Sequence, residues 1–166
     1  MEQYTSAARL AEAIRLRAEG QHEAARHILR ELLAAAPEDA RLHYHMAWVH
    51  DALGEEAAAA PYYERAIELG LAGDDLRGAL LGLGSTYRAL GVYERAVEVL
   101  QRGLDTFPDD RSFAVFLAMA RYNTGAHADA MELLLRAIAE TSDDAMIRRY
   151  RRAILFYADK LDQIWT

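Results

Sequence analysis

Apolar side chains recur along this chain at the spacing of helices that bury one face. In residues 77–110 a first apolar series ends at Gly91, and a second runs from Val92 to Leu104. The first series occupies one helix face at i, i+3, i+4 and i+7, through Leu80, Leu83, Gly84 and Tyr87. Glycine favours the left-handed turn that ends a helix, so this stretch predicts two helices joined at Gly91.

The same unit occurs four times. The glycine between the two helices recurs at spacings of 34, 37 and 34 residues, as Gly20, Gly54, Gly91 and Gly125. Three units close on Pro-Glu-Asp, Pro-Asp-Asp or Ser-Asp-Asp, which stop one helix and cap the next. We therefore predict one domain over 1–166, with a lead-in at 1–5 and a last helix at 145–166. The repeats are predicted at 6–39, 40–73, 77–110 and 111–144.

Two departures from the regular repeat are expected between the second and third units. Pro61 lies within the second helix of its unit, where a proline removes a hydrogen bond, so we expect a kink in the helix over 55–69 and a change of curvature. The three extra residues 74–76 are expected in a long connection over 70–75.

The residues at fixed positions of these units resemble the tetratricopeptide repeat family. The third unit matches the 34-residue pattern at positions 4, 7, 8, 11, 15, 17, 20, 24, 27 and 32, through Leu80, Leu83, Gly84, Tyr87, Gly91, Tyr93, Ala96, Leu100, Gly103 and Pro108. The other units keep part of it in the same register. Small residues at positions 8 and 20 let the paired helices cross closely. The resemblance implies an all-α, right-handed superhelix without catalytic activity.

Composition narrows the function classes. The chain has 166 residues, no cysteine and a net charge of −7, which excludes disulfide frameworks and cysteine-ligated metals and argues against nucleic-acid binding. No uncharged apolar stretch is long enough for a transmembrane helix, and from the acidic N-terminal residues we expect no signal peptide. We expect a cytoplasmic, bacterial protein that does not bind membranes.

Candidate chemistry is sparse. Gly82-Leu83-Gly84 lacks the third glycine and the preceding strand of a dinucleotide site. His43 and His50 share a helix face about 10.5 Å apart, too far for one metal ion. Paired acids such as Asp109-Asp110 lie at helix starts, where they serve as caps. The sequence predicts no catalytic, cofactor-binding or metal-binding residues, and therefore no enzyme.

The resemblance also implies a concave groove lined by the first helix of each repeat. A peptide or protein partner is expected there, on an apolar floor that includes solvent-exposed Tyr44 and Trp48, with arginines facing an acidic segment. Carried over by position, the predicted binding residues are Arg41, Tyr44, Trp48, Leu81, Arg88, Met119, Tyr122 and Arg149.

The segment 145–166 supports an alternative. Its apolar residues are spread too widely for one buried stripe, which favours burial of this helix against a second copy. The alternative function is therefore a self-associating structural protein whose groove or C-terminal helix is buried in a homodimer. The run Arg148-Arg149-Tyr150-Arg151-Arg152 is the sharpest charge feature of the chain. Pairing with the acidic body, pairing across a dimer and binding of an anionic partner all stay open for these arginines.

Overall fold

The computed structural model describes residues 2–165, with side chains from residue 6 onward. Over these residues the chain is all α-helix and loop, without strands. Its helices are α1 (Glu2–Ala18), α2 (His22–Ala35), α3 (Ala40–Ala52), α4 (Glu56–Glu68), α5 (Gly73–Ala89), α6 (Tyr93–Thr106), α7 (Arg111–Asn123), α8 (His127–Thr141) and α9 (Ala145–Tyr157). The predicted all-α class is confirmed.

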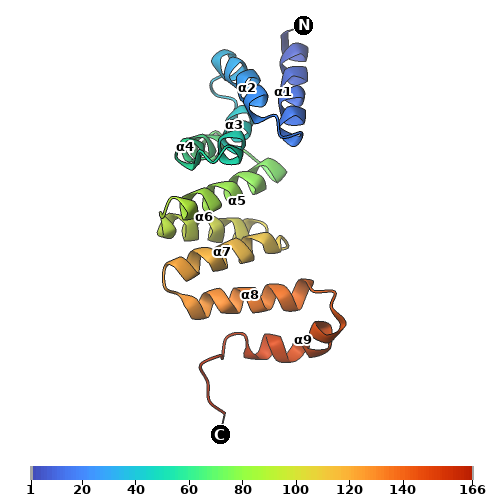
Figure 1. The fold of residues 1–166 in the computed structure, drawn as a ribbon, viewed down its shortest axis with the longest axis vertical. Helices are drawn as coiled ribbons and strands as arrows, with labels where there is room; N and C mark the ends of the chain where they lie inside the picture. The colour runs from blue at the N-terminus through green and yellow to red at the C-terminus, as the bar shows by residue number, and fades with distance from the viewer. Residues whose placement is uncertain (1, 166) are drawn as a thin grey trace.

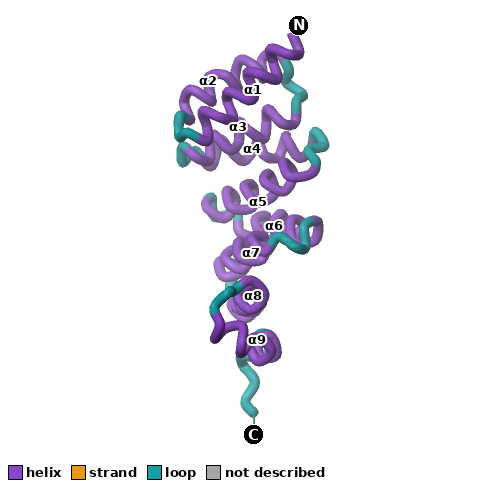
Figure 2. Tube along the Cα trace, turned by 90° about the vertical axis from the view of Figure 1, so that its right-hand side faces the viewer, coloured by secondary structure: helices purple, strands orange, loops and turns teal. Residues whose placement is uncertain are grey.

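The helices stack as antiparallel pairs into an elongated solenoid, with the two chain termini at opposite ends (Figures 1 and 2). Each first helix packs on its own second helix, α1 on α2, α3 on α4, α5 on α6 and α7 on α8. The first helices of the four pairs also approach one another closely along their backbones, whereas the described second helices do not, although Arg95 of α6 reaches Glu64 of α4 through side chains. The first helices therefore form the more closely spaced inner layer, which we call the inner face.

The turns occur at the glycine and aspartate positions predicted from the sequence. The glycine that joins the two helices of a pair has φ of 78° at Gly20, 73° at Gly54, 76° at Gly91 and 85° at Gly125. These values lie in the left-handed region, where a side chain would be strained. Between pairs, Asp39, Asp110 and Asp144 cap α3, α7 and α9 by accepting backbone N–H bonds.

The inserted residues form helix rather than a loop, contrary to the expected connection over 70–75. Helix α5 begins at Gly73 and has 17 residues, whereas α3 and α7 have 13. Residues 74–76 thus lengthen α5 at its N-terminal end, where Asp74 and Asp75 interact favourably with the helix dipole. Likewise, residues 2–5 of the predicted lead-in belong to a helix, since α1 begins at Glu2, and residue 1 lies outside the described part.

Pro61 does not interrupt α4, which continues through it as one helix. The proline is exposed and is only the sixth residue of α4, so the missing donor affects the carbonyl of Ala57 and leaves the rest of the helix paired. The change of curvature expected at this point stays a prediction.

The last helix is shorter than predicted. Helix α9 ends at Tyr157, whereas the sequence pattern extends it to 166, of which residue 166 lies outside the described part. The chain turns at Lys160, whose N–H donates to the Tyr157 carbonyl at 2.9 Å. The Trp165 ring then returns to lie 5.6 Å from the ring of Phe156 and 6.1 Å from that of Tyr157. Aromatic packing thus replaces the last helical turns.

Helix α9, the last helix of the stack, has charged residues at positions that are buried in α5. Its cap, Asp144, is equivalent to the caps of α3 and α7, so Arg148, Arg151 and Arg152 occupy repeat positions 4, 7 and 8. Buried Leu80, Leu83 and Gly84 hold these positions in α5. All three arginines are exposed, and α9 has no buried residue. A polar outer face of this kind is typical of a terminal helix in a repeat protein.

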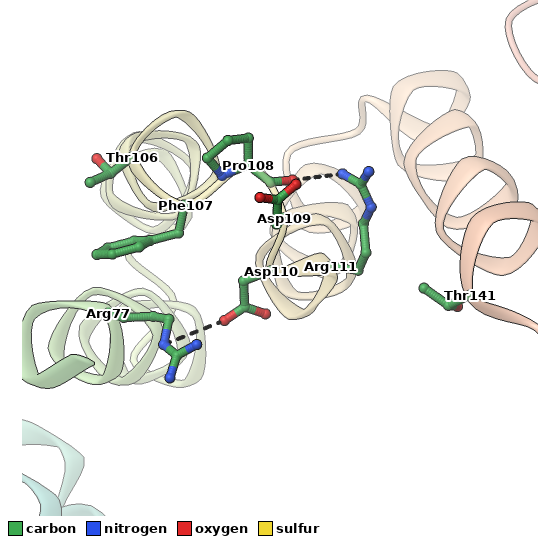
Figure 3. A pocket seen from close by; sticks show the side chains of 8 residues that line it. All are labelled: Arg77, Thr106, Phe107, Pro108, Asp109, Asp110, Arg111 and Thr141. Carbon is green, nitrogen blue, oxygen red and sulfur yellow. Dashed lines mark hydrogen bonds and ion pairs between the residues drawn. The ribbon is translucent and has the colours of Figure 1, made fainter. Parts of the chain in front are cut away.

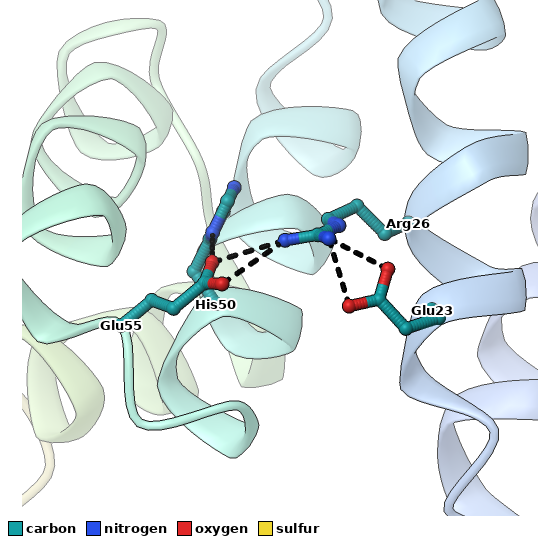
Figure 4. Close-up of polar contacts among 4 residues, drawn as sticks. All are labelled: Glu23, Arg26, His50 and Glu55. Atoms are coloured by element: carbon teal, nitrogen blue, oxygen red, sulfur yellow. Dashed lines mark hydrogen bonds and ion pairs between the residues drawn. The ribbon is translucent and has the colours of Figure 1, made fainter.

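A polar cluster ties the first pair to the second (Figure 4). The guanidinium of Arg26 in α2 binds Glu23 at 2.6 Å and Glu55, before α4, at 3.1 Å. Glu55 also contacts Nδ1 of His50 at 2.6 Å, and these contacts lower the pKa of the Glu55 carboxyl, with the His50 hydrogen bond as the main cause. His50 is thus a packing residue of the repeat interface.

Candidate functional site

An apolar cavity of about 450 Å³ opens beside α7 and α8. Helix α5 contributes the Arg88 side chain to its wall, and the other lining residues come from the last helix pair. They are Ala118, Met119, Tyr122, Asn123, His127, Ala130, Met131 and Leu134. Tyr122 is 64% exposed, and its ring lies 4.8 Å from that of His127. The cavity is therefore a shallow apolar hollow with polar groups at its rim.

The cavity exists because the last pair lacks a covering helix. Helix α9 contacts α8 but not α7, whereas in the earlier pairs the next first helix contacts both helices. At repeat position 24, Leu29 and Leu100 are almost fully buried, but the equivalent Leu134 is partly exposed. Apolar surface that is core in the other repeats is thus accessible here.

Three of the predicted binding residues come together in this cavity, namely Arg88, Met119 and Tyr122. Arg88 is half-buried, and its Nε has no hydrogen-bond partner within the described part of the chain. Trp48 lies elsewhere on the inner face and lines a second cavity between α3 and α5. Four of the eight predicted residues are therefore divided between two cavities.

The other predicted residues lie outside the two cavities. Tyr44 is only 9% exposed, so its expected exposure is wrong. Its hydroxyl occupies the space of a side chain at Gly78, where an added Cβ would overlap with it. Leu81 is half-buried against the core, Arg41 pairs with Asp75 at 3.0 Å, and Arg149 is exposed on α9.

The sequence pattern missed the contribution of α8. His127, Met131 and Leu134 line the cavity, but they belong to a second helix, and the positional pattern assigns only first-helix residues to the groove. Met131 is 45% exposed. The sequence did contain one indication of this contribution. The apolar face of α8 is followed by an arginine-rich α9, which is unsuited to cover it.

A polar group is buried near Trp48. The Arg17 guanidinium lies 4.1 Å from the Trp48 ring and 2.8 Å from Nδ1 of His45. Burial, followed by the charge of Arg17, lowers the pKa of His45 to about 4. His45 is therefore neutral at pH 7 and accepts a hydrogen bond from Arg17.

A third cavity, of about 600 Å³, lies at the helix ends between α5 and α7 (Figure 3). Arg77 reaches Asp110 at 3.9 Å, and Arg111 donates to the Pro108 carbonyl at 2.8 Å. Asp110 also caps α7, and Arg111 pairs with Glu140. These polar groups hold the helix ends together, which accounts for the cavity structurally.

Two of the histidines, His43 and His50, pack against the same tyrosine. His50 stacks on Tyr62 with ring centroids 5.3 Å apart, and His43 lies 5.8 Å from the same ring. Among the described residues, we find no group of three histidine or acidic side chains placed to hold a metal ion. The described helices also include none that is long and apolar enough to span a membrane.

Comparison with known structures gives the same fold. The protein in "MamA RS-1 ArsTM double mutant" has a TM-score of 0.75 at 16% identity, with 95% of this chain and 86% of that chain covered. "YrrB: a TPR protein with an unusual peptide-binding site" gives 0.73 at 19%, covering 89% and 74%. "APC/C hetero-tetramer Cut9-Hcn1" gives 0.76 at 18%, covering 92% of this chain but 29% of the other.

No curated protein matches this sequence. A family profile described as "Tetratrico peptide repeat" matches residues 40–161, from α3 into the segment after α9. The match covers well over half of the chain and includes the three helix pairs that carry the clearest repeat pattern. The chain therefore belongs to the tetratricopeptide repeat family.

Proposed function

We propose that this protein is a non-catalytic adaptor that holds a peptide or protein segment on its inner face, anchored at the α7–α8 cavity. The exposed apolar surface of this cavity carries the proposal. Its volume of about 450 Å³ is within the usual range for ligand sites. Its Tyr, Met and Arg side chains are residue types enriched at protein interfaces, and Tyr and Arg are frequent hot spots.

The family supports this function, because tetratricopeptide repeats generally mediate contacts between proteins. The neighbour YrrB is described as a TPR protein with an unusual peptide-binding site. The anchor that we propose for this chain departs from the regular groove. It depends on a second helix, α8, as much as on the first helices. A short, cytoplasmic, bacterial adaptor is the cellular setting that we propose.

Peptide display tests the anchor. Peptides selected on the wild type would be labelled, and their affinity measured by fluorescence polarisation against the double variant Tyr122→Ala/Met131→Ala. We expect at least about a tenfold loss, or about 1.4 kcal/mol, because these two exposed side chains form the rim. The control variant Leu90→Ala/Val92→Ala removes similarly exposed apolar side chains at the α5–α6 turn. Equal affinity of the first variant and the wild type would reject the anchor.

Self-association through 145–166 is a second candidate function. One observation favours it: exposed apolar side chains concentrate in this segment. They are Met146, Tyr150, Phe156, Tyr157, Leu161, Ile164 and Trp165. On α9, Met146, Tyr150 and Tyr157 follow a spacing of four and seven residues, which places them in one stripe that a second copy would cover.

A further inference from the structure

The cavity beside Trp48 has a composition unlike that of the α7–α8 cavity. It has a volume of about 400 Å³ and lies between α3 and α5, with one wall from the start of α4. Its lining residues are Trp48, Asp51, Ala52, Glu56, Ser85, Thr86 and Ala89. An aromatic ring, two carboxylates and two hydroxyls therefore face one hollow.

Asp51 is held in a defined orientation. One carboxylate oxygen accepts a hydrogen bond from the Tyr63 hydroxyl at 3.0 Å, and the other lies 2.9 Å from the Thr86 hydroxyl, whose single proton is shared with the Gly82 carbonyl at 2.8 Å. A carboxylate has about four acceptor sites, so two remain for a ligand. Tyr63 is fully buried and Thr86 is 2% exposed, which makes this support rigid.

The two acids of this cavity are the exceptions among half-buried acids. Six described acidic residues are half-buried, and four of them pair with arginine: Glu64 with Arg95, Asp75 with Arg41, Asp110 with Arg77, and Glu132 with Arg136. Asp51 and Glu56 are the other two, and neither has an ion-pair partner within the described residues. Glu56 lies in the first turn of α4, where the helix dipole stabilises an acid that has no ion-pair partner. Asp51 has no such position, so the dipole does not account for its missing partner.

Burial of Asp51 without a cation has an electrostatic cost. Burial, as the main cause, raises the pKa of the Asp51 carboxyl, and the charge of Glu56 raises it further. A cation placed between the two carboxylates would offset this cost and would also face the Trp48 ring. That ring already has one cationic partner, Arg17, at 4.1 Å.

We propose that this cavity binds the cationic side chain of an arginine or lysine in a segment held on the inner face. The proposal rests on the proposed function and names the chemistry of its ligand. Helix α5 serves both cavities, with Thr86 in this one and Arg88 in the other. Asp51 and Glu56 attract a basic side chain, whereas Arg88 repels it from the α7–α8 cavity. Opposite charges at the two cavities therefore set the direction in which a segment binds.

A small probe tests the cavity separately from peptide binding. The chain has two tryptophans, so a Trp165→Phe background makes Trp48 the only emitting indole. Its fluorescence would be titrated with Nα-acetyl-arginine amide, and with the citrulline analogue as a neutral probe of nearly the same shape. We expect saturable binding of the arginine probe in about the millimolar range and at least tenfold weaker binding of the citrulline probe.

Variants test whether the fluorescence response comes from binding in the cavity beside Trp48. Glu56→Gln and Asp51→Asn should each weaken arginine-probe binding several-fold, whereas Glu98→Gln, at an exposed acid on α6, should leave it unchanged. If Asp51→Asn fails to fold, Glu56→Gln carries the test, since its side chain lies at the cavity edge. Equal binding of both probes, or equal binding by Glu56→Gln and wild type, would overturn the proposal. The peptide-display result stands apart, because Tyr122 and Met131 line the other cavity.

Discussion

Leu100 of α6 packs directly over the backbone of Gly84 in α5. A Cβ added at Gly84 would overlap with Cγ of Leu100, which is itself fully buried. This contact occurs at the crossing of the two helices in the third repeat, between positions 8 and 24 of the pattern. The close approach of α5 and α6 therefore depends on the absence of a side chain at Gly84.

Gly84→Ala should destabilise the protein even though alanine is the better helix former. Alanine gains about 1 kcal/mol in helix propensity, but overpacking costs about 1–3 kcal/mol and forces the crossing apart. Urea unfolding would measure a net loss of about 1 kcal/mol. In a Leu100→Ala background the same change should become neutral or stabilising, and purely additive effects would contradict the contact.

The buried His45 predicts a loss of stability in acid. Its pKa is about 4 in the folded chain and near 6.5 when unfolded, so the unfolded chain binds more protons between these values. The contribution is therefore complete above about pH 6.5 and falls by at most about 3 kcal/mol toward pH 4. Urea unfolding at several pH values should show a shallower pH dependence of stability for His45→Gln than for the wild type, and an unchanged dependence would contradict the role of His45.

Pro61→Ala should stabilise α4. The alanine restores an N–H donor for the carbonyl of Ala57 and removes the ring clash, in a helix that is already continuous at this point. We expect an increase of about 1–3 kcal/mol in the free energy of unfolding, measured by urea titration. A decrease would show that the proline fits its position without cost and restricts the unfolded chain instead.

Self-association through α9 would be visible by light scattering. The second candidate function predicts a mass of twice 18.6 kDa at micromolar concentration, and a return to 18.6 kDa in Tyr150→Asp/Tyr157→Asp. Arg149→Ala, which leaves the apolar stripe intact, serves as the control. A wild type that stays at 18.6 kDa would remove this candidate and leave peptide binding as the proposed function.

The repeat pattern was sufficient for the helix pairs, because each pair depends on local signals. Apolar residues at helical spacing mark the buried faces, and Gly91 and its equivalents require a left-handed turn that few other residues adopt. The end of α9 could not be predicted in this way. Ile164 and Trp165 continue an apolar pattern, but Trp165 packs back on Phe156 instead of extending the helix.

The candidate site was only partly predictable, since it depends on contacts between distant parts of the chain. Met119 and Tyr122 followed from their repeat positions, but the exposure of Met131 and Leu134 results from the missing contact between α7 and α9. Tyr44 was expected at the surface. It is buried because Gly78, one repeat further along, leaves room for its hydroxyl.

The arginines of α9 also affect whether copies of this protein can stack end to end. A second copy could place its α1 on α9 in the position of a further repeat. This contact would bury Arg148, Arg151 and Arg152 and remove the water that solvates their charges. Burying an unpaired charge costs several kcal/mol, so that arrangement is strongly disfavoured. Head-to-tail stacking of this kind does not close on itself and produces filaments. The same three side chains that end the solenoid therefore disfavour fibre formation through the C-terminal helix.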